Sequence, residues 1–331
     1  MSVSKPSFEA HVLSLLQRIQ RGLSTVELVH VPHKRWPLPL NLNPNRRTDP
    51  NGTLRVSVLD SSFNPPTLAH LALANSSFGG RWGDDDAKLL LLSVRNVDKT
   101  LKPGDATYLQ RLQMMVLLAK DIAHTGRDSD TLGDRRDTAD ENNVAVAIID
   151  QPTFVGKSST LLAFLRSHLS SLHTLAPASP PWQPQLTFLQ GFDTLERLFA
   201  PRYYPSEEAM MVALRAFFSP SGDNSRVVCA RRTTYVPGSS AEAHTGHVQQ
   251  QHQDEYERER STLAAAREFI DNERVVLVDI GEDERTFSSS EVRERRAAGG
   301  MEWRRFVTPD IAEFVEAEGL YVAPGQAPSL N

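Results

Sequence analysis

The sequence predicts an α/β protein built on a doubly wound parallel sheet. Short runs rich in aliphatic and β-branched residues alternate along the chain with segments whose apolar residues recur at helical spacing. Parallel strands need crossover connections, which helices usually supply, so this alternation favours a sheet covered by helices on both faces. The chain has 331 residues, of which 40% are hydrophobic and 23% charged, so it is long and apolar enough to bury such a core.

The first predicted element is an amphipathic helix. Apolar residues between positions 7 and 30 recur every three or four residues, which predicts a helix docked on the domain. Five prolines between 32 and 50 then stop regular structure, and Asn51-Gly52 forms a turn before the first predicted strand. The predicted strands are 54–59, 88–94, 144–150, 186–190, 226–230 and 274–279, and the predicted helices between them are 68–76, 107–122, 158–171, 194–199 and 206–218.

These elements divide the chain into an N-terminal extension (1–50), a domain (51–323) and a tail (324–331). Two segments within the domain interrupt the alternation, one at 124–143 and a Pro/Gly- and then His/Gln-rich one at 233–255. Both are expected to be mobile surface loops. The second contains His244, His247 and His252, but no carboxylate or cysteine framework fixes their spacing, so a polar loop is favoured over a metal site.

Composition argues against several classes of protein. The 36 Lys and Arg against 41 Asp and Glu leave a net charge of −5, which disfavours a nucleic-acid partner. Cys229 is the only cysteine, so an intrachain disulfide framework and a thiolate-rich zinc site are excluded. No apolar run approaches the roughly 20 residues of a membrane-spanning helix, and the N-terminus lacks the apolar core of a signal peptide. We therefore expect a cytoplasmic protein with no membrane partner; a nuclear location and the oligomeric state are left open.

The first candidate site follows the strand at 54–59. A run of turn-forming residues from Asp60 to Pro66 leads into a helix that carries Thr67 and His70 three residues apart, on the same face. At the carboxyl edge of a parallel sheet, such a junction directs backbone N–H groups and a positive helix end toward a crevice that suits phosphate. His70 would face the phosphate as a cation or as a hydrogen-bond donor. The alternative is that Thr67 only caps the helix and His70 is an ordinary helix histidine.

The second candidate site is a serine-rich run that follows the last predicted strand and opens a helix. Ser288 can cap this helix while Ser289, Ser290 and their amides face an anion. Arg293 lies one turn further along, with a planar guanidinium suited to phosphate oxygens. Taken alone, the run is better explained as a serine cap followed by a surface arginine. A pair of such junctions, in this order along the chain, favours a phosphate site.

Together the two runs resemble the motifs of the nucleotidylyltransferase superfamily, most closely those of the nicotinamide mononucleotide (NMN) adenylyltransferases. The run from Ser62 to His70 is similar to the family's His/Thr-x-x-His motif, and the run from Thr286 to Arg293 is similar to its Ile-Ser-Ser-Thr-x-x-Arg signature. The resemblance implies a Rossmann-like fold with His70 and Arg293 as the catalytic residues. It also implies an ATP-phosphate site that comprises Ser62, Phe63, Thr67, His70, Ser288, Ser289, Ser290 and Arg293.

Segments between the motifs extend the resemblance to about residues 54–322. Gly191 and Asp193 correspond to a Gly-x-Asp that contacts a nucleotide ribose, and Arg231 to an arginine beside the adenine. Lys99, with Lys102 as the alternative, corresponds loosely to a lysine that approaches phosphate, in a stretch that continues through Tyr108 and Arg111. The departures are Ser61 where the family usually has Gly, Thr67 in place of His, and Glu291 in place of Lys. They resemble a divergent fungal subgroup.

The resemblance implies transfer of AMP from ATP to NMN, which forms NAD and releases pyrophosphate. The partners would be ATP and NMN, with Mg²⁺ carried mainly by the ATP phosphates and with no protein metal ligand. Two alternatives stay open: another nucleotidyl transfer, such as cytidylyl transfer or phosphopantetheine adenylylation, and an ATP-binding or ATP-hydrolysing protein whose acceptor site has decayed. An NAD dehydrogenase is disfavoured because no Gly-x-Gly-x-x-Gly follows the first strand. The choice between nicotinamide and nicotinate mononucleotide is also left open.

Overall fold

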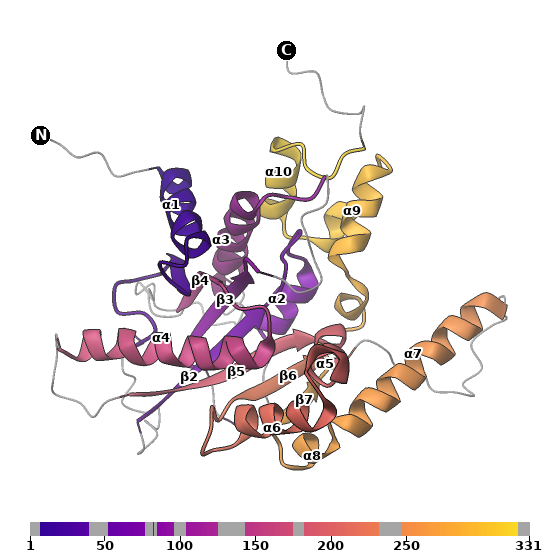
Figure 1. The fold of residues 1–331 in the computed structure, drawn as a ribbon. Coiled ribbons are helices and arrows are strands. Elements are labelled where there is room, and N and C mark those ends of the chain that lie inside the picture. The colour runs from indigo at the N-terminus through magenta and orange to yellow at the C-terminus, as the bar shows by residue number, and fades with distance from the viewer. Residues whose placement is uncertain are drawn as a thin grey trace, which may run out of the picture.

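A seven-stranded sheet forms the centre of the protein (Figure 1). The computed structural model describes residues 7–39, 52–76, 82, 85–95, 104–124, 143–174, 182–231 and 246–323. The strand order is β1-β4-β3-β2-β5-β6-β7, and every neighbouring pair is parallel except β1 with β4. The fold class predicted from the sequence is therefore confirmed. The strands are β1 (Val26–His30), β2 (Thr53–Asp60), β3 (Ala87–Ser93), β4 (Val144–Ile149), β5 (Gln183–Gly191), β6 (Arg226–Ala230) and β7 (Val275–Val278).

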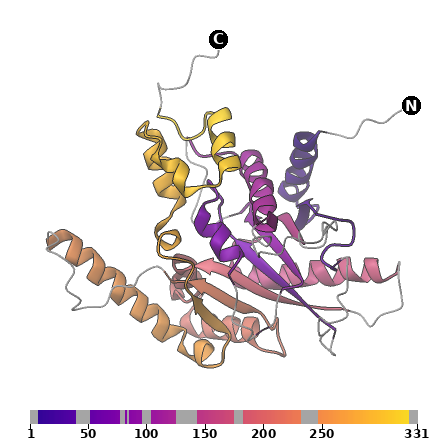
Figure 2. The same ribbon diagram turned by 180° about the vertical axis from the view of Figure 1, so that it is seen from behind.

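Helices cover both faces of this sheet, as Figures 1 and 2 show from opposite sides. One face packs against α1 (Phe8–Gln20), α2 (Leu68–Ala74), α3 (Tyr108–His124), α9 (Ser289–Ala297) and α10 (Pro309–Ala317). The other packs against α4 (Phe154–Thr174), α5 (Phe192–Leu198), α6 (Glu207–Phe218) and α8 (Arg267–Asp271). The remaining described helices are α7 (Gly246–Ala265) and three 3₁₀ turns, at Pro201–Tyr203, Glu284–Thr286 and Glu302–Phe306.

The order of the strands reverses beside β2. From β2 the chain moves outward on one side through β3 and β4, and it then returns to pair β5 with the other side of β2. Strands β6 and β7 continue outward from β5. In open α/β sheets, ligands bind outside the carboxyl ends of the strands at such a reversal. The loops that follow β2 and β5 are therefore placed where a ligand is expected.

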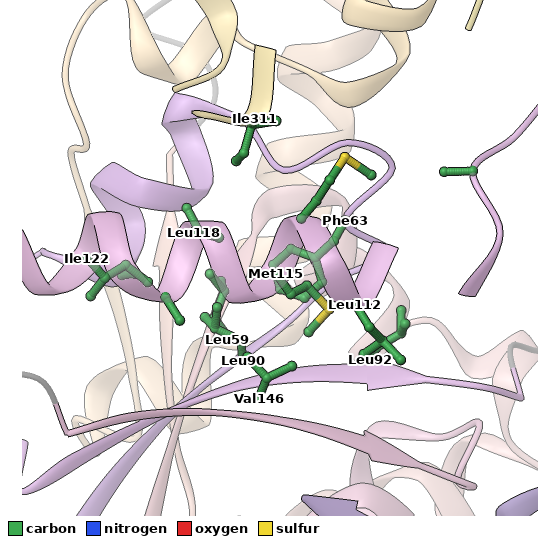
Figure 3. Close-up of a cluster of buried hydrophobic side chains, with 14 of the residues drawn as sticks. Leu59, Phe63, Leu90, Leu92, Leu112, Met115, Leu118, Ile122, Val146 and Ile311 are labelled. Carbon is green, nitrogen blue, oxygen red and sulfur yellow. The ribbon is translucent and has the colours of Figure 1, made fainter. Parts of the chain in front are cut away.

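Alternate residues of β2 pack into the two cores and anchor the loop that follows. Val58 is buried on the α4 face, whereas Leu59 is buried on the α3 face. Figure 3 shows Leu59 and Leu90 of the sheet beneath Met115 and Leu118 of α3. The Phe63 ring, just after β2, packs into the core on the α3 face (Figure 3). The loop after β2 is thus tied to the core by a buried aromatic ring.

The N-terminal extension departs from the prediction of one docked helix over 7–30. Helix α1 ends at Gln20, and Gly22 follows with φ +68°, a left-handed conformation that typically ends helices. Residues 26–30 then form β1, which pairs antiparallel with β4. The helical prediction was wrong beyond residue 20 because a strand with two buried valines, Val26 and Val29, mimics helical spacing over so short a run. The extension therefore contributes an edge strand to the sheet.

The segment predicted as a loop at 233–255 is partly helical. Residues from Gly246 onward belong to α7. This helix is rich in Gln, Glu and Arg, which are good helix formers, but it contains few apolar residues. Hydrophobic periodicity therefore missed this helix. Residues 232–245, most of the predicted loop at 124–143, and the tail at 324–331 lie outside the described residues.

Candidate nucleotide-binding site

The loop between β2 and α2 has an unusual backbone conformation at Phe63. This residue has φ +46° although it carries a bulky side chain, which costs about 1–3 kcal/mol and is typical of functional sites. Complete burial of the ring holds the conformation in place. Within the described part of the chain, the N–H groups of Ser62 and Phe63 donate no hydrogen bond. Two main-chain donors expected from the sequence to bind phosphate are therefore available.

The His70 imidazole beside this loop is neutral. Its Nδ1 accepts the backbone N–H of Thr67 at 3.0 Å, so the ring proton is assigned to Nε2, which lies 2.9 Å from Ser61 Oγ. Burial lowers the pKa of His70 to about 4, because desolvation disfavours the imidazolium. In the free protein this favours the neutral form of His70, and its role toward a phosphate stays a prediction.

The second motif lies directly against the first. Ser288 caps α9 by accepting the N–H of Glu291 at 3.1 Å, as the sequence predicted. The Ser289 hydroxyl donates to the carbonyl of Pro65 at 2.7 Å, and the Arg293 guanidinium donates to the carbonyl of Asn64. Motifs separated by more than 200 residues in the sequence therefore form one site.

Some side-chain roles in the second motif differ in detail from what the sequence suggested. The hydroxyl of Ser289 is used to hold the Pro65 carbonyl, which leaves its part in anion binding to the main chain. Ser290 Oγ accepts a hydrogen bond from Arg293 at 3.2 Å. The Arg293 side chain keeps 31% of its surface exposed, so it can reach a ligand while it holds the loop.

Sequence reasoning missed a group of residues behind the loop. Asn64 donates to Asp105 Oδ1 at 2.8 Å and accepts the hydroxyl of Tyr321 at 2.8 Å. Arg111 is buried and donates to the carbonyls of Ala106 at 2.9 Å and Ser62 at 3.4 Å. The family resemblance placed Arg111 at the start of a helix without assigning it a contact. The available signals were Asn64 within the motif and a charged residue, Arg111, in an otherwise apolar helix pattern.

A buried ion pair lies at the same edge of the sheet, on the α4 side. Lys157 of α4 lies 2.6 Å from Asp60, the last residue of β2, and the two side chains are only 9% and 6% exposed. Lys157 also lies over the ring of Phe154, 5.5 Å from its centroid. Asp60 stood at the start of the motif run, but nothing in the sequence indicated its partner. The pair ties the end of the central strand to the opposite helical layer.

The expected nucleotide-binding residues lie at the ends of β5, which pairs with β2, and of β6, which pairs with β5. Gly191 caps α5 at the end of β5, and a Cβ added to it would meet nothing within 4 Å. Asp193 is exposed in the first turn of α5. Arg231, exposed just after β6, donates its backbone N–H to Val278 at 3.0 Å. All three are at the carboxyl edge where the motifs meet, whereas Lys99 and its alternative Lys102 lie outside the described residues.

Metal-ligand clusters and membrane-spanning helices are both absent from the part of the chain that the structure describes. No group of three or more His, Cys, Asp or Glu side chains there could hold a metal ion. No helix there is both long and apolar enough to cross a membrane.

Comparison with known proteins gives one sequence relative and a weak likeness to solved structures. No family model matches the chain. Two structures of nicotinic acid mononucleotide adenylyltransferase from Plasmodium falciparum, one complexed with NaAD and one with APC, are 14% and 12% identical. Each likeness covers 81% of this chain and 97% of the other, with TM-scores of 0.43 and 0.42, which is too low to carry an argument.

The sequence relative is a Schizosaccharomyces pombe protein named "Putative nicotinamide mononucleotide adenylyltransferase". It is 33% identical over 177 residues, which are 54% of this chain and 53% of that protein. The match thus spans about half the length of the relative. The chain is therefore similar, over half its length, to a protein named for this family, and this confirms the resemblance that its two motifs predicted.

Proposed function

We propose that this protein is an NMN adenylyltransferase that transfers AMP from ATP to NMN, forming NAD and pyrophosphate. One observation carries the proposal: Ser289 and Arg293 of the second motif bind the carbonyls of Pro65 and Asn64 in the first. These contacts bring together, at the reversal of strand order, the two motifs that are expected to bind phosphate. The name of the sequence relative supports the same activity, and the match to it covers 53% of that protein.

The reaction needs charge neutralisation and positioning more than proton transfer. An oxygen of the NMN 5′-phosphate attacks the α-phosphorus of ATP, and the bond from that phosphorus to the bridging oxygen of the β-phosphate breaks. The attacking phosphate is already an anion, so no general base is required. Arg293 supplies a positive charge, and the N–H groups of Ser62 and Phe63 are free to donate. The Nε2–H of His70, which lies 2.9 Å from Ser61 Oγ in the free protein, would donate to a phosphate that takes the place of that hydroxyl.

Magnesium fits this proposal as a companion of ATP. Asp105 is the carboxylate that lies between the two motifs, and it is held by Asn64 and two arginines, which makes it a poor metal ligand. The ATP phosphates themselves would therefore hold the Mg²⁺, which would neutralise charge on the triphosphate. Mg²⁺ dependence and a cytoplasmic or nuclear location stay predictions.

The test is a direct assay of the purified protein. It is incubated with Mg²⁺ and ATP together with NMN, nicotinate mononucleotide or phosphopantetheine, and separately with Mg²⁺, CTP and a cytidylyl acceptor. The adenylylated or cytidylylated product and pyrophosphate are then separated by chromatography. NAD with equimolar pyrophosphate supports the proposal. ATP hydrolysis without a dinucleotide product would refute it in favour of the decayed acceptor site.

A matched pair of variants assigns any activity to this site. Arg293→Ala removes the arginine that joins the motifs. Arg215→Ala removes an arginine of α6 that pairs with Glu268 on the surface, where an ion pair contributes little to stability. The first variant should lose activity and the second should keep it.

A further inference from the structure

Asp105, in the segment just before α3, lies where three parts of the candidate site converge. Its Oδ1 accepts the side-chain amide of Asn64 at 2.8 Å and lies 3.8 Å from Nε of Arg293. Its Oδ2 lies 3.6 Å from Nη2 of Arg111. One carboxylate therefore contacts two arginines and the asparagine of the first motif.

The two arginines hold the loop on either side of its strained residue. Arg111 donates to the carbonyl of Ser62, which precedes Phe63, and Arg293 donates to the carbonyl of Asn64, which follows it. Phe63 between them has φ +46°. The guanidinium groups therefore stabilise the backbone conformation that leaves the loop N–H groups available.

Hydrogen bonds at both ends of its amide group orient the Asn64 side chain. Its Oδ1 accepts both the Tyr321 hydroxyl at 2.8 Å and the backbone N–H of Ala106 at 3.2 Å, while its Nδ2 donates to Asp105. These partners fix which end of the amide is nitrogen and which is oxygen. The amide group thus depends on Asp105 for its only described acceptor.

Electrostatics require a carboxylate at this position. Burial lowers the pKa of Arg111, the nearby positive charge of Arg293 lowers it further, and Asp105 opposes both effects. Without that negative charge, two like charges would face each other, one of them buried. The arginines could then separate, and each would release the carbonyl that it holds.

We propose that Asp105 is a positioning residue that sets the conformation of the phosphate-binding loop through Arg111 and Arg293. The proposal rests on the proposed function, because it names how that same site is held in shape. The competing role for a carboxylate at this position is to weaken the attraction of the site for a polyanion. The two roles predict opposite effects on ATP binding.

The test compares Asp105→Asn with Asp271→Asn. Asp105→Asn is isosteric and keeps an acceptor for Asn64 but loses the charge that holds the arginines. Asp271 is a matched control, since it is 69% exposed on α8 in the other helical layer. We expect Asp105→Asn to weaken binding of Mg²⁺-ATP, measured by calorimetry, and to lower kcat by roughly 10²-fold, as misplaced groups do. The control should match the wild type.

A second measurement tests whether Asp105 affects catalysis through Arg293 or independently of it. In a double-variant cycle, kcat is measured for Asp105→Asn, for Arg293→Ala and for the protein that carries both changes. The fold-loss in kcat of the double variant should be smaller than the product of the two single fold-losses, because both changes remove the same interaction. Unchanged kcat with equal or tighter ATP binding in Asp105→Asn would overturn the proposal in favour of simple charge reduction. Failure of Asp105→Asn to fold would also overturn it, by making Asp105 a residue of the fold alone.

A third measurement distinguishes failure of this proposal from failure of the proposed function. Hydrogen exchange of the free protein needs neither ATP nor an acceptor, and it reports opening of the loop through the amides at its two ends, Ser61 and Thr67, which donate to Leu91 and to His70 Nδ1. Faster exchange there in Asp105→Asn than in Asp271→Asn supports the positioning role even if the wild type makes no NAD. Equal exchange in both variants refutes it even if the wild type is an active enzyme.

Discussion

The neutral state of His70 makes the stability of the protein depend on pH in a predictable way. Burial lowers the pKa of the folded imidazole to about 4, against an ordinary value of 6.5. Between these two values the unfolded chain binds a proton at this site and the folded protein does not. The stabilisation that comes from keeping His70 neutral is therefore fully present above pH 6.5 and is lost as the pH falls toward 4.

The size of the effect follows from the two pKa values. A shift from 6.5 to about 4 corresponds to roughly 3 kcal/mol in total, with 1.36 kcal/mol for each unit. At pH 5 the unfolded imidazole is almost fully protonated and the folded one almost fully neutral, so about 2 kcal/mol should already be lost relative to pH 7.5. That loss is large against the 5–15 kcal/mol typical of a whole domain.

The assay is urea unfolding of the wild type and of His70→Asn at pH 7.5 and pH 5. The asparagine keeps an acceptor for the Thr67 N–H but cannot titrate. His30 also has a pKa lowered by burial, but it is present in both proteins and cancels in the difference. The wild type should lose about 2 kcal/mol more than the variant between the two pH values. Equal losses would mean that His70 titrates normally and that its pKa is not lowered in the folded protein.

Three further predictions concern activity and the buried ion pair. His70→Ala should lower kcat by roughly 10²–10³-fold, the usual effect of losing one transition-state donor, while circular dichroism shows an intact fold; wild-type turnover would make the histidine structural. Arg293→Lys should impair ATP use and Arg293→Ala should impair it more, because lysine keeps the charge but not the planar fork that reaches the Asn64 carbonyl and a phosphate together; near-wild-type ATP affinity and turnover in both would remove Arg293 from the site. Lys157→Met should lower the free energy of unfolding in urea by about 3–5 kcal/mol because Asp60 is left buried and unpaired, and Asp60→Leu in the same chain should restore most of it; a loss below about 1 kcal/mol would contradict burial of the pair.

The sequence identified both halves of the candidate site and the order in which they occur. The turn before His70 and the serine cap before Arg293 are local patterns, since each depends on residues within one or two helical turns. The alternation of strands and helices likewise predicted the sheet. Errors arose where local patterns are ambiguous: the short strand at residues 26–30 mimicked a helix, and the polar residues of α7 gave no apolar stripe.

Only the tertiary structure decided what the site residues touch. Ser289 turns its hydroxyl to Pro65 instead of to a ligand, and the contacts of Asn64 reach Asp105 and Tyr321, which lie 41 and 257 residues away. Which side chains meet across such separations depends on how whole helices pack on the sheet, and no repeating pattern in the sequence records that packing. The charge state of His70 also depends on tertiary packing, because its pKa is lowered by burial among residues that packing brings together. The sequence alone therefore determined which residues lie at the carboxyl edge of the sheet, and the packing of α3, α9 and the C-terminal segment against that edge determined what each of them can do.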